Sequence, residues 1–257
     1  MSDHVQDQDA FRAAASRLVA ARHPHALGAL LGGSAAQGRA TAGSDLDVAV
    51  LLPEGDHSGR EVVRHEGRVA ELFLNTVADL PEFFAWDRAR RRGTVLFLYD
   101  QGLPLADPHG HVARTRALAR QVLASGPAPL TPEEREYGRY ALTCYTDDLA
   151  DLADLRAPGG AICTDPATRY EQLSVADHVL REAAHLLTAH RGAWTGIGKW
   201  LPRRLLNADP VLGEALLDGH RAVAERADPV PLAAAAEQVL DLLGGPLREG
   251  YGHRWKP

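Results

Sequence analysis

The chain has 257 residues, of which 45% are hydrophobic and 24% charged, and this composition excludes a mainly disordered protein. No apolar run approaches the roughly 18 residues that a membrane span needs, so we expect no membrane partner. The formal net charge is −6, and residues 129–257 hold most of the excess, with 19 acids against 14 bases. This balance makes nucleic acid an unlikely partner and permits a cationic substrate.

The cysteine content and the first residues indicate where the protein works. Only two cysteines are present, so a disulfide framework is not expected and a reducing compartment fits the sequence. The sequence opens with neither a basic stretch nor an apolar run of the secretory type. We therefore expect a cytoplasmic protein. The oligomeric state is not indicated by the sequence.

Residues 1–126 alternate between helical and strand-like patterns. Apolar residues at helical spacing predict a first helix, and two short apolar runs predict buried strands. Two further runs that flank Glu66-Gly67 predict a hairpin. The expected helices cover 9–22, 79–92 and 109–124, and the expected strands cover 26–31, 45–52, 60–65, 68–75 and 94–99.

Residues 127–257 lose this alternation. Ser125-Gly126-Pro127 interrupts the chain, and Thr131-Pro132 followed by two glutamates is typical of a helix start. Ala/Leu-rich stretches of helical periodicity then cover 132–156, 168–191, 210–226 and 230–243. We expect an α+β protein with two domains, a mixed-sheet domain with flanking helices over 1–126 and an α-helical bundle over 127–257.

A glycine-serine turn follows the first predicted strand. Gly33 permits a tight turn or a close approach of the backbone to a ligand. A helix that starts at Ser34 would present free backbone N–H groups, which suit a phosphate. The Gly33-Ser34 pair is therefore a candidate phosphate site.

Two acids stand at the head of the next predicted strand, in Ser44-Asp45-Leu46-Asp47. Residues i and i+2 of a strand point to the same face, so Asp45 and Asp47 would present two carboxylates side by side. Like charges this close repel each other unless a cation lies between them. Carboxylate oxygens together with substrate phosphates suit Mg²⁺.

Glu71 is a third acid that fits the same plan. It interrupts the apolar run Val69–Asn75, where a lone carboxylate is costly unless it has a partner. Pairing of this strand beside 45–52 would bring Glu71 to the two aspartates, and three carboxylates could hold metal and accept a proton. Glu66 and Asp79 remain alternatives for this acid, although neither lies in the middle of a strand.

The pattern Gly33-Ser34 … Ser44-Asp45-Leu46-Asp47 resembles the signature of the DNA polymerase β-like nucleotidyltransferase superfamily. Within it, the chain most resembles antibiotic nucleotidyltransferases of the aminoglycoside-adenylylating type, which join a small nucleotidyltransferase domain to a helical domain. The motif covers residues 32–52. Residues 53–126 resemble the family moderately, and the helical half resembles it only in having a helical domain at this place in the chain.

The resemblance implies a role for each residue of the motif. Gly33 and Ser34 would bind the triphosphate of a nucleotide, with Ser44 in support. Asp45 and Asp47 would hold Mg²⁺, and Glu71 would act as general base as well as a metal ligand. The implied cosubstrate is ATP or another nucleoside triphosphate.

Two features of the helical half extend this hypothesis. The family commonly presents a basic residue from its helical domain to the triphosphate, and Lys199 is our candidate because lysine is otherwise found only at position 256. Asp147 and Asp151 share a helical face, with Asp148 beside it, and a cationic acceptor would relieve their repulsion. A solvated loop charge and a solvated acidic face are the respective alternatives.

We therefore expect an Mg²⁺-dependent enzyme that moves a nucleoside monophosphate, AMP from ATP, to a hydroxyl group of a small molecule such as an aminoglycoside antibiotic. An alternative is the same chemistry on a protein or tRNA acceptor, as in toxin–antitoxin systems. A non-catalytic nucleotide-binding module is a further alternative, against which the retention of all three acids argues.

Overall fold

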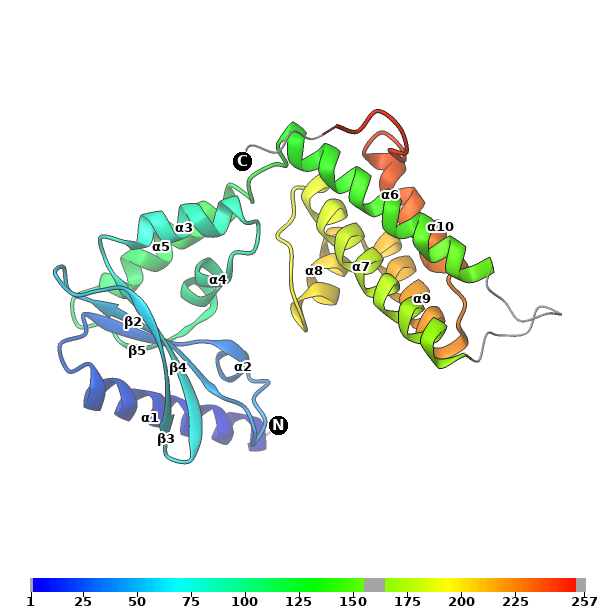
Figure 1. The fold of residues 1–257 in the computed structure, drawn as a ribbon. Helices are drawn as coiled ribbons and strands as arrows, with labels where there is room; N and C mark the ends of the chain where they lie inside the picture. The colour runs from blue at the N-terminus through cyan, green and yellow to red at the C-terminus, as the bar shows by residue number, and fades with distance from the viewer. Residues whose placement is uncertain (1, 155–164, 253–257) are drawn as a thin grey trace. The chain divides into compact units, whose positions relative to one another are not determined.

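The computed structural model describes residues 2–154 and 165–252. Their contacts divide the chain into two units, Met1–Gly126 and Pro127–Pro257. The first unit is built on a mixed five-stranded sheet and the second on helices, which confirms the α+β fold class (Figure 1). No helix in the described part of the chain is both long and apolar enough to cross a membrane.

The sheet of the first unit has the strand order β3-β4-β2-β1-β5. Its central pair, β2 and β4, is parallel, and every other pair is antiparallel. The expected hairpin is present, with Glu66-Gly67 at its turn and both residues at positive φ. The strands are β1 (Gly28–Leu31), β2 (Leu46–Leu52), β3 (Gly59–His65), β4 (Arg68–Thr76) and β5 (Leu103–Ala106).

Helices cover both faces of this sheet (Figure 1). The helix α1 (Ser2–Arg22) packs with Phe11 and Leu18 against alternate residues of the strands, among them Val48 and Leu72. The opposite face is covered by three helices, and it is the face that carries Asp47 and Glu71. These helices are α3 (Leu80–Ala89), α4 (Thr94–Gln101) and α5 (His111–Ala124).

The strand expected over 94–99 is wrong, because this run is the helix α4. The Asp87 carboxylate accepts the backbone N–H groups of Val95 at 2.5 Å and Leu96 at 3.1 Å, and so caps the helix start. Leu96 and Tyr99 are buried one helical turn apart. A continuous apolar run of six residues does not distinguish a buried strand from a buried helix.

The strand that completes the sheet, β5, was not expected. It is only four residues long and contains Pro104, which is tolerated because β5 lies at the edge of the sheet. Its half-exposed alternation is too short to be recognised as a strand pattern.

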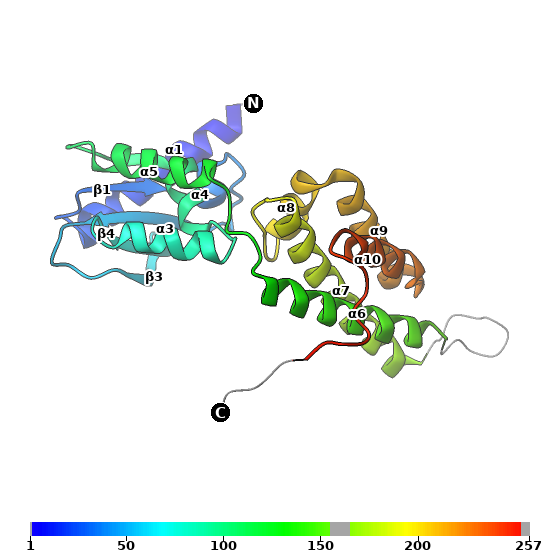
Figure 2. The ribbon, with the colours of Figure 1, turned by 90° about the horizontal axis from the view of Figure 1, so that it is seen from above.

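In the described residues of the second unit, the regular secondary structure is all helical. The core is formed by Leu142 and Leu149, with the leucines, alanines and valines of the following helices. The expected helices are confirmed, and Figure 2 shows them from a second direction. They are α6 (Pro132–Asp154), α7 (Pro166–His190), α9 (Pro210–Arg226) and α10 (Val230–Leu242); a short helix that was not expected, α8 (Trp200–Ala208), lies between α7 and α9.

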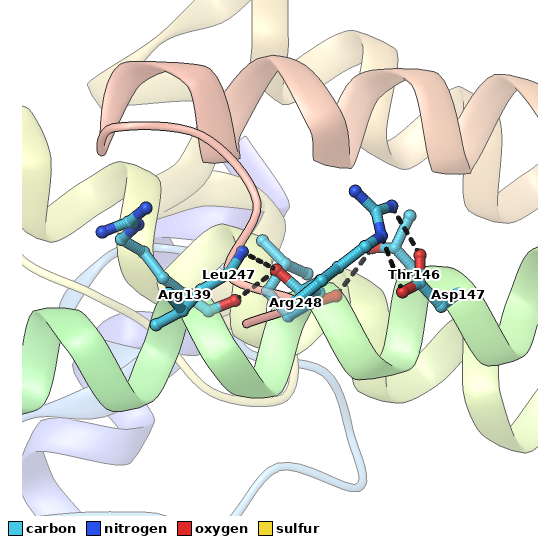
Figure 3. Close-up of polar contacts among 7 residues, drawn as sticks. Arg139, Thr146, Asp147, Leu247 and Arg248 are labelled. Atoms are coloured by element: carbon cyan, nitrogen blue, oxygen red, sulfur yellow. Dashed lines mark hydrogen bonds and ion pairs between the residues drawn. The ribbon is translucent and has the colours of Figure 1, made fainter. Parts of the chain in front are cut away.

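The segment 244–251, which follows α10, is fixed along α6 by polar contacts (Figure 3). Arg139 donates to the carbonyl oxygens of Gly245 at 3.0 Å and Gly244 at 2.9 Å. The Leu247 N–H donates to Thr143 Oγ1 at 3.0 Å. Tyr251 stacks on Tyr140, with ring centroids 4.2 Å apart. This segment is therefore part of the folded surface of α6.

Asp209 joins the end of α7 to the start of α9. Its carboxylate accepts the Leu212 N–H at 3.1 Å as the N-cap of α9. The same carboxylate receives Arg191 Nε at 3.0 Å and Nη2 at 2.6 Å. The backbone hydrogen bond from Leu212 and the Arg191 guanidinium hold the pKa of Asp209 below its ordinary value.

Replacing Asp209 by Ala should lower the free energy of unfolding by about 1–2 kcal/mol at pH 7, because a helix cap and a charged hydrogen bond are lost. The lowered pKa makes this contribution present above about pH 4 and lost as the pH falls further. Urea unfolding of both proteins from pH 7 to pH 3 measures the difference, which should shrink on acidification. An equal difference at every pH would contradict this assignment.

Candidate active site

Asp47 and Glu71 are register partners on the parallel strands β2 and β4. Directly paired residues lie on the same face of a sheet, so both carboxylates emerge on one side. Asp47 is the one residue of β2 that is not fully buried, and the Glu71 side chain is 21% exposed. The strand pairing expected from the sequence therefore brings these two acids together.

Asp45 is placed differently. It lies before β2, which begins at Leu46, and it is exposed. Across residues 2–154 and 165–252, no group of three or more His, Cys, Asp or Glu side chains is arranged to hold a metal ion. Asp45 is thus close to Asp47 in the sequence, but in the structure its side chain does not form one cluster with Asp47 and Glu71.

Arg60, on the neighbouring strand β3, forms an ion pair with Glu71. Its guanidinium carbon lies 4.8 Å from the centroid of the Phe73 ring, which is its partner across the hairpin. The hydrogen bond to Glu71, together with the charges of Glu71 and Asp47, raises the pKa of Arg60. Arg60 was not expected at the site, although the hairpin register about Glu66-Gly67 places it beside Phe73 and two pairs away from Glu71, on the same face of the sheet.

The turn between β1 and α2 (Gly33–Ala36) is packed against Asp47. The Gly32 N–H donates to the Asp47 carbonyl oxygen at 2.7 Å. Gly33 has a φ of 61°, and a Cβ atom there would lie 1.8 Å from Asp47 Oδ2. Only glycine leaves room for the Asp47 carboxylate at this position. Glycine also adopts the positive φ of this turn without strain.

Ser34 and Ser44 lie on either side of the loop that joins α2 to β2. Ser34 lies in α2, and its carbonyl oxygen accepts the Arg39 N–H at 2.9 Å. Ser44 Oγ accepts the Thr41 N–H at 2.9 Å, and the Ser44 N–H donates to the Thr41 carbonyl at 3.0 Å. Ser44 thus closes the turn that leads into Asp45 and β2.

The donor set at this strand end fits a hard divalent cation. Asp47 and Glu71 supply carboxylate oxygens on one face, and such oxygens are the ligands that Mg²⁺ prefers. The site already attracts positive charge, because both carboxylates favour the charged form of Arg60. The residues therefore match the chemistry of a metal site, with a guanidinium now bound to one of its two acids.

In the second unit, Asp147 is engaged by the segment 244–251. Arg248 donates to both of its carboxylate oxygens, at 3.0 Å from Nε and 2.6 Å from Nη2 (Figure 3). The charge of Asp147 is therefore compensated within the chain, whereas Asp148 and Asp151 are exposed. Sequence patterns do not reveal this pair, because its members are 101 positions apart.

Lys199 is exposed and stands at the N-cap position of α8. The stretch that follows it is the helix α8, and the guanidinium carbons of Arg203 and Arg204 lie 4.9 Å and 5.4 Å from the centroid of the Trp200 ring. Burial lowers the pKa of Arg204. The nucleotide contact expected of Lys199 stays a prediction.

Residues 16–94 match the family described as nucleotidyltransferase domain. The matched segment contains β1 to β4 and therefore Gly33, Asp47 and Glu71. This match indicates that the protein is a nucleotidyltransferase enzyme.

A solved structure of a nucleotidyltransferase-like protein from Exiguobacterium sibiricum is similar to the chain, with 14% identity and a TM-score of 0.43. The similarity covers 89% of this chain and 73% of that protein. No curated protein matches the chain.

Proposed function

We propose that the protein transfers a nucleoside monophosphate, AMP from ATP, to a hydroxyl group of a small molecule in an Mg²⁺-dependent reaction. The observation that carries this proposal is the pairing of Asp47 with Glu71 beside Gly33, within a segment that matches a nucleotidyltransferase family. Paired carboxylates next to a glycine turn suit a metal–triphosphate substrate better than an apolar or anionic ligand.

The residues of the strand end take distinct roles in this proposal. Asp45 and Asp47 are the proposed metal ligands, and Asp45 would have to turn toward Asp47 from the exposed position it has in the structure. Bound Mg²⁺ would supply positive charge to the phosphate oxygens. The Gly33-Ser34 turn, which packs with Gly33 against Asp47, and Ser44, which closes the turn before β2, are the proposed contacts of the triphosphate. Because the Asp47 carboxylate fills the space that a Cβ at position 33 would need, the backbone of this turn lies directly beside the proposed metal ligand.

Glu71 is the proposed general base as well as a metal ligand. The acceptor hydroxyl oxygen forms a bond to the α-phosphorus, the bond from that phosphorus to pyrophosphate breaks, and the hydroxyl proton passes to a Glu71 carboxylate oxygen. Arg60 occupies the Glu71 carboxylate in the structure, so in this proposal the ion pair opens to give the acceptor hydroxyl access to a carboxylate oxygen.

The second unit supplies the proposed acceptor and phosphate contacts. Asp148 and Asp151 are exposed acids for a cationic acceptor of the aminoglycoside type, whereas Asp147 would first have to release Arg248. Lys199 is exposed and is the proposed lysine contact of the triphosphate. The acidic balance of residues 129–257 supports a cationic acceptor over an anionic one.

Transfer of label from nucleotides tests the proposal. Each of the four nucleoside triphosphates, labelled at the α-phosphate, is incubated with the full chain, Mg²⁺ and one acceptor pool: aminoglycosides, uncharged sugars, bulk tRNA or cell protein. We expect label on an aminoglycoside, with one pyrophosphate released per label. Label confined to tRNA or protein would overturn the small-molecule acceptor, and binding of ATP without pyrophosphate release in any pool would overturn the enzyme.

A further inference from the structure

Arg60 occupies an unusual place for a surface arginine. It lies on the edge strand β3 with a side chain that is 60% exposed, yet it turns toward the sheet face that carries the candidate site. There it forms an ion pair with Glu71 and lies over the Phe73 ring. Its guanidinium is therefore held beside β4 by two contacts, the Glu71 carboxylate and the Phe73 ring.

The charge of Arg60 acts on both acids of the site. The ion pair joins it to Glu71, and Asp47 is the register partner of Glu71 on the adjacent strand β2, so one guanidinium lies near two carboxylates. Two carboxylates on paired strands repel each other, and a nearby cation relieves that repulsion. Arg60 thus supplies the positive charge that the site would otherwise draw from a metal ion.

We propose that Arg60 is a positioning residue that competes with the divalent cation for Glu71 and Asp47 and thereby sets the metal affinity of the site. This inference rests on the proposed function, because it takes the two acids as the metal site. A divalent ion gains Glu71 as a ligand only after the Arg60 ion pair opens. The exposed position of Arg60 permits this opening, because water can solvate the released guanidinium.

Binding of Mn²⁺ to the full chain without nucleotide tests this inference and needs no turnover. The free Mn²⁺ signal in electron paramagnetic resonance gives the dissociation constant for the parent protein and for Arg60→Gln. Arg64→Gln is the matched control, because Arg64 is exposed on the same strand and face and lies two pairs from Glu71, on the opposite side from Arg60. Asp47→Asn reports whether the acids bind metal at all.

Arg60→Gln should bind Mn²⁺ about five-fold more tightly than the parent, which corresponds to ~1 kcal/mol. Arg64→Gln should change the dissociation constant by less than about two-fold, because it removes the same charge but no contact to an acid. Equal thermal midpoints would show that the variants fold alike. Unchanged or weaker Mn²⁺ binding by Arg60→Gln would overturn the inference, as would equal effects of the two arginine variants.

The Asp47→Asn protein separates the two proposals. If it binds Mn²⁺ more weakly while Arg60→Gln behaves as the parent, the metal site stands and the role of Arg60 fails. If Asp47→Asn binds Mn²⁺ as tightly as the parent, the metal assignment in the proposed function fails. Absence of Mn²⁺ binding in both the parent and Arg60→Gln would also overturn the inference, because removal of the competing charge should reveal the site.

Discussion

Asp47→Asn is expected to lower the rate of pyrophosphate release by about 10³-fold with little loss of stability. Asparagine keeps the shape of the side chain but removes the charge that a divalent cation and the developing phosphate charge require. The backbone of Asp47 continues to pair with β4 and to accept the Gly32 N–H, so the sheet is retained. Rates are measured with the acceptor and nucleotide that the parent uses, and stability by thermal unfolding.

Asp56→Asn is the matched control for this variant. Asp56 is exposed in the turn after β2, so it tests the loss of one negative charge near the same strand. It should retain the parent rate within about two-fold. Parent-like pyrophosphate release by Asp47→Asn would contradict the assignment of this carboxylate to the reaction.

Gly33→Ala is expected to abolish most activity and to destabilise the first unit. The φ of 61° alone costs an alanine about 1 kcal/mol, and the added Cβ would overlap the Asp47 carboxylate. Relief of this overlap must displace either the turn or Asp47. We expect a fall in the rate of at least ~10²-fold, since a misplacement of about 1 Å at a reacting centre has this effect.

Gly38→Ala separates the two causes. Gly38 has a φ of 64°, but a Cβ there would meet no atom within 4 Å. It should show the backbone cost in thermal unfolding and keep its activity. Equal activity of the Gly33 and Gly38 variants would argue against a functional contact between the Gly33 turn and Asp47.

The predictable part of this structure is the part that local patterns determine. The hairpin about Glu66-Gly67 follows from two alternating runs joined by a turn, and its register is set by the turn. The strand over 45–52 and the position of Glu71 in the next apolar run sufficed to anticipate the pairing of Asp47 with Glu71. Most helix bounds agree within a few residues for the same reason.

The unpredicted part depends on contacts between distant residues. The run 94–99 is helical because the Asp87 carboxylate binds its first N–H groups, and sequence periodicity does not show such a cap. Arg60 at Glu71 and Arg248 at Asp147 are charged pairs made by tertiary structure. The sequence does not show which charged residues meet in space. The engagement of Glu71 and Asp147 by arginines therefore could not be predicted from it.

The polar contacts of the segment 244–251 have a consequence for the order in which the helical unit folds. Arg139 and Asp147 meet their partners across sequence separations of 106 and 101 residues, so each contact closes a long loop. Closing a long loop costs the chain conformational entropy before the contact stabilises it. Such contacts are therefore expected to form later than the local hydrogen bonds of a helix. During synthesis, we therefore expect these contacts of α6 to form only after α7 to α10 have been made, because their partners lie in the segment 244–251.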